Sequence, residues 1–448
     1  MPNDRAPGVP GMPGVPPPLP PPPPPPAPWR LPPPPPPPSP PPPPPRRRGW
    51  VTLVAVLAIG GLVAGSFAAA WTSTDESDPA PGRGDDPEEA DRPSDVPPAS
   101  EAEVREAVDE ISAVVEQERG LSFREPVEVD LAGEGEFQRR LLEDFDEDVD
   151  ELRRAEVVFQ ALGLVGPDID LVESMRELLG AGVVGFYDPE TDELVVRGTA
   201  LTPYVRTTIA HELTHALDDQ HFDLDRPEYD DADDEVGFGF SAVVEGNARR
   251  VEAAYRDSLS REEQEDATAE ELELGAGIDL GGVPTVLVEL IAAPYGLGET
   301  FVDELLASGG QRELDDAFAD PPRTSEQVID AEAYREGEGR IEVPVPSVPG
   351  EVVEDGVAGQ VLIQLVLASE VGAGQAAEAA VGWGGDWAVA WRDGDRSCAT
   401  LSVVGDDAGE TAELRAAFEE WADARADDGS EAAVEPGESG TVTVEACS

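Results

Sequence analysis

The sequence contains no lysine, so arginine supplies all 30 of its basic residues, against 95 acidic ones. The formal net charge at pH 7 is therefore −65. Such a surface repels phosphate groups, which excludes nucleic acid and anionic membrane surfaces as natural partners. Because salt screens the repulsion between carboxylates, this composition is typical of a surface that stays hydrated at high salt. We expect the acidic runs at 142–151, 223–235 and 262–273 to be solvated faces.

The second of these runs also raises the alternative of calcium binding. Carboxylate oxygens are ligands that Ca²⁺ prefers, but the spacing of these aspartates matches no known calcium loop. A solvated face is therefore the favoured interpretation. The candidate calcium ligands are Asp223, Asp225, Asp230, Asp231, Asp233 and Asp234.

Cysteine is also scarce, because Cys398 and Cys447 are the only two. They lie in CATLSVVG and TVTVEACS, and the alternation of apolar and polar residues in both segments predicts strands. Outside the cytosol we expect the two residues to form a disulfide. The alternative is two free thiols.

Histidine is rare as well, and all three histidines lie in one segment, TTIAHELTHALDDQHF. His211, Glu212 and His215 form an HExxH pattern. On a helix, residues i and i+4 share one face, so both imidazoles can reach one metal ion. Glu212 is offset by one residue, where it can serve as general base toward a water that Zn²⁺ activates. The pattern therefore predicts a zinc site for peptide hydrolysis.

The residues around this pattern predict a buried helix. Glu212 is the only charged residue between Thr207 and Leu217. Polar groups inside a protein require hydrogen-bond partners or a metal, because leaving them unpaired costs several kcal/mol. The alternative is a pair of core histidines that are hydrogen-bonded to Glu212. We favour the metal site, because the motif and its apolar context agree.

Two residues compete for the place of third metal ligand. Glu245 is the only charge in GFGFSAVVEGNA, where a carboxylate must be paired, protonated or bound to metal. His221 would complete the spacing HExxHxxxxxH of the metzincins. However, Asp218 occupies the position of their glycine, and no methionine follows His221 to form their Met-turn. We favour Glu245, with His221 as the alternative.

The first hundred residues of the chain predict a membrane anchor. Residues 1–49 are rich in proline, which indicates a disordered cytoplasmic tail that is a spacer or a ligand for a proline-binding partner. Three arginines, Arg46, Arg47 and Arg48, precede an uncharged segment at 50–71 that is long enough to be a transmembrane helix. The positive-inside rule then places the tail in the cytoplasm and the rest outside, although a cleaved signal peptide is the alternative. Residues 72–100 form an acidic stalk with too few apolar residues to fold.

We expect two folded parts of α+β class, at 101–350 and 351–448. The first shows helical patterns at 135–162, 168–180, 284–293 and 299–308. In it, two alternating runs flank DPET in VVGFYDPETDELVVRG, which predicts a β-hairpin directly before the HExxH helix. The second part contains the disulfide strands, a helix at 411–424 and three tryptophans, Trp383, Trp387 and Trp391, that we expect in the core.

Several segments resemble bacterial zinc metallopeptidases of the gluzincin kind, many of which are anchored to the membrane. The resemblance covers about residues 183–334. It implies a mostly helical, thermolysin-like zinc-protease core, with Zn²⁺ on His211, His215 and Glu245 and with Glu212 as base. In thermolysin-like proteases, the strand before the active helix binds the substrate backbone by strand addition. The matching segments are GFYDPETDEL, HELTHALDDQHFDL, AVVEGNA, APYGLGETFVDELLASGG and DDAFADPPRTSEQVIDAEAY.

The chain departs from the family pattern at two places. Asp330 and Ala331 stand where the family has a His-Pro pair, while the tyrosine that follows is kept as Tyr334. Arg249 stands four residues after Glu245, where thermolysin-like enzymes place an aspartate behind the zinc ligands. Tyr334 is the candidate for stabilising the transition state, with Tyr255 and Tyr229 as further candidates.

The sequence thus predicts a membrane-anchored zinc peptidase that acts on proteins or peptides outside the cytoplasmic membrane. A protease-like binding or scaffold module without activity is the main alternative. The intact Glu212 argues against that module, because a protein that only binds does not need the base. A zinc hydrolase for a non-peptide amide, such as one in cell-wall crosslinks, is a third interpretation.

Overall fold

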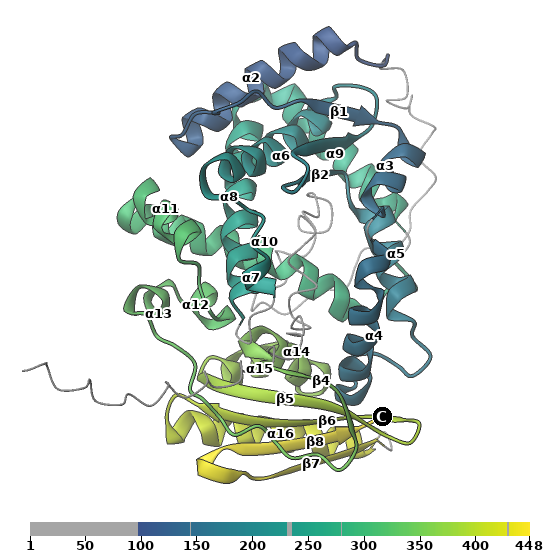
Figure 1. The fold of residues 1–448 in the computed structure, drawn as a ribbon, viewed down its shortest axis with the longest axis vertical. Helices are drawn as coiled ribbons and strands as arrows, with labels where there is room; N and C mark the ends of the chain where they lie inside the picture. Colours follow the sequence, from purple (N-terminus) through teal and green to yellow (C-terminus); the bar gives the residue numbers. More distant parts are fainter. Residues whose placement is uncertain (1–96, 144, 231–234, 279, 428–429) are drawn as a thin grey trace, which may run out of the picture. The chain divides into compact units, whose positions relative to one another are not determined.

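Fifteen α-helices and two β-sheets make up the part of the chain that the structure describes (Figure 1). The structure is a computed structural model, and it describes residues 97–448 except 144, 231–234, 279 and 428–429. The predicted α+β class is confirmed, with helix predominating. The predicted tail at 1–49 and transmembrane helix at 50–71 lie outside the described residues, as does the predicted stalk up to residue 96.

The smaller sheet contains three strands in the order β1-β3-β2. β2 and β3 form the predicted antiparallel hairpin, while β1 pairs with β3 in parallel, a pairing that local alternation alone does not assign. β2 is consequently an edge strand of this sheet. The three strands are β1 (Val129–Ala132), β2 (Gly185–Asp188) and β3 (Glu193–Arg197).

The HExxH segment lies on α6, which packs against three other helices, α2, α8 and α9. The side chain of Thr202 caps the first turn of α6, and Pro203 follows at a position where a proline loses no helical hydrogen bond. Ile209, Leu213 and Leu217 are fully buried and hold α6 in the core. The helices are α2 (Glu101–Arg119), α6 (Pro203–Phe222), α8 (Val236–Ser258) and α9 (Arg261–Gly277).

One long helix replaces two that the sequence predicted. Instead of separate helices at 284–293 and 299–308, α10 (Thr285–Gly309) runs through Pro294 without ending. A proline removes one helical hydrogen bond, and the burial of both halves of α10 along α8 offsets that loss. Of the described helices, α10 alone is long and apolar enough to cross a membrane, yet 61% of its most apolar window is buried inside the protein. A helix in the core of a protein can also be long, apolar and mostly buried.

The backbones of α8 and α10 touch beside the HExxH helix. A Cβ added at Gly246 would lie 2.2 Å from the carbonyl oxygen of Gly298. A Cβ added at Gly298 would lie 2.1 Å from the carbonyl oxygen of Ala242. Both positions therefore need glycine. Because Gly246 directly follows Glu245, this close contact of α8 with α10 fixes the position of Glu245 relative to α10.

The predicted helix at 135–162 is two helices, α3 (Glu134–Leu141) and α4 (Phe145–Leu162). Both helices contact α5, but α3 also packs against β3 of the smaller sheet while α4 packs against the larger sheet. A helical period in the sequence does not reveal such a change of direction. The predicted helix at 168–180 is α5 (Leu171–Gly182).

The larger sheet is antiparallel throughout, in the order β4-β5-β6-β8-β7 (Figure 1). Trp383 and Trp391 on β5 are buried as predicted, and Trp387 is partly buried. The predicted helix at 411–424 is present as part of α16. The elements are β4 (Glu351–Gly356), α14 (Gly359–Val371), α15 (Ala373–Ala380), β5 (Trp383–Asp393), β6 (Arg396–Gly405), α16 (Ala408–Asp427), β7 (Glu431–Pro436) and β8 (Val442–Cys447).

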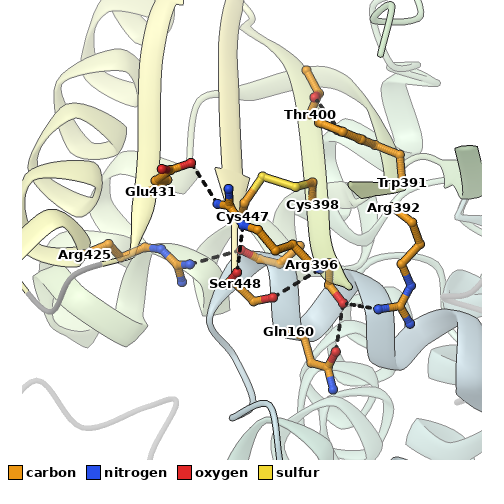
Figure 2. Close-up of a disulfide and its surroundings, with 12 residues drawn as sticks. Gln160, Trp391, Arg392, Arg396, Cys398, Thr400, Arg425, Glu431, Cys447 and Ser448 are labelled. Carbon is orange, nitrogen blue, oxygen red and sulfur yellow. Dashed lines mark hydrogen bonds and ion pairs between the residues drawn. A yellow bond between two sulfur atoms is a disulfide. The ribbon is translucent and has the colours of Figure 1, made fainter. Parts of the chain in front are cut away.

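The predicted disulfide between Cys398 and Cys447 is present (Figure 2). The two residues face each other across β6 and β8, with Cα atoms 4.1 Å apart. Next to it, the hydroxyl of Ser397 donates to Oε1 of Gln160 on α4 at 2.8 Å. The sheet is thereby attached to the N-terminal helices. The remaining short elements are α7 (Pro227–Asp230), α11 (Gln311–Ala319), α12 (Ser325–Ile329), α13 (Ala331–Glu336) and η3 (Glu438–Gly440).

Candidate metal centre

Two helices bring three potential metal ligands together. His211 and His215 lie one turn apart on α6, and Glu245 faces them from α8. Oε2 of Glu245 lies 3.3 Å from Nε2 of His211 and 3.5 Å from Nε2 of His215. All three side chains are buried, and one ligand atom from each lies within 4.8 Å of the other two. This cluster, the one such group among the described residues, could hold a metal ion.

Glu212 lies next to these ligands and is completely buried. Neither of its carboxylate oxygens has a hydrogen-bond partner among the described residues. Burial raises the pKa of Glu212 to about 7, although His211 and His215 act in the opposite direction. A carboxyl group with a pKa near neutrality can both accept and return a proton at that pH. Glu212 therefore has the properties of a general base.

The edge strand β2 approaches Glu212 at Gly185. A Cβ added to Gly185 would lie 2.7 Å from Cγ2 of Thr208 and 2.8 Å from Oε1 of Glu212. These distances are shorter than van der Waals contact, so only glycine lets the strand lie against α6. The predicted hairpin thus stands directly beside the predicted base.

The acid behind His211 is Glu252, which the sequence analysis did not identify. Oε2 of Glu252 lies 3.2 Å from Nδ1 of His211 and 2.8 Å from Nη1 of Arg249. The position four residues after Glu245 holds Arg249, but a residue seven positions later lies on the same face of a helix. That spacing is the signal that would have found Glu252. Arg249 pairs with Glu252 and not with Glu245.

The charges of the cluster shift the pKa values of its members. Burial by itself would raise the pKa of Glu245, but His215 and His211 outweigh burial and lower it to about 2. Burial is likewise outweighed at Glu252, where Arg249 and His211 lower the pKa to about 2. Burial lowers the pKa of His211, but the two glutamates outweigh it and raise that pKa to about 10. The two glutamates therefore favour the protonated form of His211 in the metal-free site.

His221, the alternative ligand, lies away from the cluster. Its Nε2 is 2.9 Å from the carbonyl oxygen of Ser122. The cause lies at Asp218, which is buried and accepts hydrogen bonds from Arg119 Nε and Asn247 Nδ2, both at 2.6 Å. α6 continues straight through Asp218, so the chain does not turn back toward the metal ligands. The geometry favours Glu245 as the third ligand.

The tyrosine beside the cluster is Tyr295 on α10, which the sequence analysis did not single out. Its ring is stacked on that of His211, with centroids 6.2 Å apart and an angle of 18° between the planes. The three predicted tyrosines use their hydroxyl groups elsewhere. Tyr334 donates to the carbonyl oxygen of Asp320, Tyr255 accepts from Nε of Arg206, and Tyr229 accepts from Nη1 of Arg226, each at 2.9 Å.

The alternative calcium site falls largely outside the described residues. Asp231, Asp233 and Asp234 belong to the part that is not described. Asp223 and Asp225 are exposed, as the solvated-face interpretation predicts.

Comparison of the chain with protein-family models, with curated proteins and with solved structures gives no match. Any statement about function therefore depends on the geometry of the cluster and on the sequence patterns that led to it.

Proposed function

We propose that this chain is a zinc-dependent peptidase that hydrolyses protein or peptide bonds, with Glu212 as general base. The observation that carries the proposal is the position of a buried carboxylate without partners beside two imidazoles and a second carboxylate. Two histidines and one glutamate are a ligand set of catalytic zinc, which leaves a fourth position open. When bound, zinc would supply a lowered pKa for a water molecule and a polarised substrate carbonyl.

The protein residues have separate roles in this reaction. His211, His215 and Glu245 would hold the metal ion. Glu212 would take a proton from the attacking water and deliver it to the leaving amine, which its pKa of about 7 suits. Because Glu212 is buried, solvent does not compete for that proton.

β2 is suited to hold an extended substrate. The amide of Arg197 donates to the carbonyl oxygen of Val184 at 2.7 Å, so these two residues form a hydrogen-bonded pair across the hairpin. In antiparallel pairing the bonded positions alternate, so the main-chain groups of Gly185 and Tyr187 point away from β3. A peptide could add to this edge as a further strand and pass Glu212. The arrangement supports a thermolysin-like core.

The proposed location is the outer side of the cytoplasmic membrane. It depends on Arg46, Arg47 and Arg48 and on the apolar segment at 50–71, all outside the described residues. The tail at 1–49 would then be cytoplasmic, where a proline-binding protein could recognise it.

Glu212→Gln in the full-length protein tests the proposal, because this change removes the base and keeps the metal ligands. Zinc content should remain that of the wild type, while peptide hydrolysis should fall by at least a thousandfold, within the range that a lost general base and buried electrostatic group together cost. The matched control is Glu270→Gln, a half-buried acid bonded to Thr202 at 3.0 Å, which should change neither quantity. Equal hydrolysis rates in wild type and Glu212→Gln would overturn the mechanism. Zinc binding without any hydrolysis would favour the binding module.

A further inference from the structure

We infer that Arg249 and Glu252 position His211 for the metal ion, and that Arg249 supplies the positive charge that balances the buried site. This inference rests on the proposed zinc site and assigns two residues of α8 that do not touch the metal. Both act through His211 and are therefore positioning residues.

The two ring nitrogens of His211 face different carboxylates. Nδ1 lies 3.2 Å from Oε2 of Glu252, and Nε2 lies 3.3 Å from Oε2 of Glu245. When Nδ1 donates its proton to Glu252, the lone pair of Nε2 is left on the side of His215 and Glu245. Glu252 thus selects the tautomer that can bind a metal there. Tyr295 stacks on the ring and limits its rotation.

Glu252 is itself held by Arg249, three residues earlier on α8. Nη1 of Arg249 lies 2.8 Å from the same Oε2 atom that His211 contacts. The guanidinium group fixes the carboxylate in place. Glu245, Arg249 and Glu252 recur at helical spacing, so one face of α8 carries a ligand, a counter-charge and a positioning acid.

When all three of its buried carboxylates are ionised, the charges of this site balance only if Arg249 is counted. Three carboxylates, those of Glu212, Glu245 and Glu252, are buried within it. A divalent metal ion would neutralise two of these charges, and one would remain in a region where an uncompensated charge is costly. Arg249 provides the third positive charge. An acid at position 249 would instead add a fourth negative charge beside the metal.

The affinity of the full-length protein for Zn²⁺, measured by competition with a chromophoric chelator, tests the inference. Glu252→Gln should weaken zinc binding by about 10- to 100-fold, the usual effect of losing a carboxylate behind a metal-bound histidine. The visible spectrum of the Co²⁺-substituted protein should also change, because the ring of His211 is released. Glu270→Gln, the control on α9, should bind zinc as tightly as the wild type.

A second pair of variants decides the matter if Glu252→Gln does not fold. Arg249→Lys keeps the positive charge and should bind zinc nearly as the wild type does, whereas Arg249→Gln should bind it several-fold more weakly. If the wild type binds zinc and both Glu252→Gln and Arg249→Gln bind it equally well, the inference is wrong and the peptidase proposal is unaffected. If the wild type binds zinc, Glu252→Gln weakens it and no peptide is cleaved, the inference stands and the peptidase proposal fails. A wild type that binds no zinc overturns both.

Discussion

At the scale of single residues, the candidate site combines a set of potential metal ligands with buried polar atoms that have no hydrogen-bond partner among the described residues. The oxygens of Glu212 and Nδ1 of His215 lie in the protein interior without hydrogen-bond partners among the described residues. Buried polar groups are nearly always satisfied, so unsatisfied ones that lie next to a set of potential ligands are candidates for function. Asp218, one turn after His215, shows the opposite case, because Arg119 and Asn247 satisfy it. The contrast between the two acids separates the part of α6 that we propose to be catalytic from its structural part.

The third ligand gives the first prediction at this scale. Glu245→Ala should remove most of the bound zinc and all hydrolytic activity, because only two imidazoles would remain. His221→Ala should leave a metal-loaded and active protein, since His221 contacts the carbonyl of Ser122 and no cluster residue. Zinc content by atomic emission, measured beside a peptide assay, checks both. The reverse result, with zinc lost only in His221→Ala, would require a metzincin-like site.

The buried charge of Glu212 gives the second prediction at the scale of single residues. Its pKa is raised from 4.5 to about 7 in the folded, metal-free protein, so the folded state holds this proton more tightly than the unfolded state does. The associated stability is present below pH 4.5 and is lost as the pH rises through about 7. Glu212→Gln carries no such charge. The metal-free variant should therefore be more stable than the wild type at pH 8, by up to roughly 3 kcal/mol, and not at pH 4.5.

Urea unfolding of both metal-free proteins at the two pH values measures this difference. An equal free-energy difference at pH 4.5 and pH 8 would show that Glu212 does not pay this cost in the folded state.

At the scale of elements, the close approach of β2 to α6 couples the hairpin to the base. Gly185→Ala would place a methyl group 2.8 Å from Oε1 of Glu212. Either the strand or the carboxylate must move, and a displacement of about 1 Å can cost about 100-fold in rate. We expect zinc binding to be kept and the rate of hydrolysis to fall by about that factor. Gly135→Ala, in α3, is the control, because its added Cβ meets nothing within 4 Å. Equal loss of rate in both variants would mean that the contact at Gly185 is unimportant.

The helices and strands also show which parts of the fold could be predicted from the sequence. Local patterns found the hairpin, α6 and the strands of the disulfide, because each has a period or a turn signal within a few residues. They did not find the parallel pairing of β1 with β3, the break between α3 and α4, or the continuity of α10 through Pro294. These three features depend on which distant surface each segment packs against. Tyr295 was missed for the same reason, since only the packing of α10 against α6 makes it a neighbour of His211. Glu252 could have been found from its helical spacing to Glu245 on α8.

At the scale of the whole molecule, the cluster of potential metal ligands is assembled from two helices, and further helices pack around it. α2 supplies Arg119, which is fully buried and pairs with Asp218 at 2.6 Å. α10 supplies Tyr295 and the glycine contact with α8. The larger sheet packs against α4 through β6, and Arg425 on α16 donates to the carbonyl oxygen of Ala161 on α4 at 3.1 Å. The arrangement of the potential metal ligands therefore depends on long-range packing, which the short HExxH pattern does not contain.

The charge of the whole chain gives the last prediction. A net charge of −65 makes the folded state repel itself, while the described surface ion pairs, such as Arg139 with Glu136, contribute only about 0–1 kcal/mol each. Salt weakens both the repulsion and the ion pairs. Because the chain contains 95 acidic residues, we expect the weaker repulsion to stabilise the folded state more than the loss of ion pairs destabilises it. Raising sodium chloride from about 0.1 M to about 1 M shortens the screening length from about 10 Å to about 3 Å. The unfolding temperature should therefore rise by several degrees over this range and level off above it. A steady rise that continues unchanged beyond about 1 M would point instead to strengthened burial of apolar surface, and a fall would mean that the ion pairs dominate.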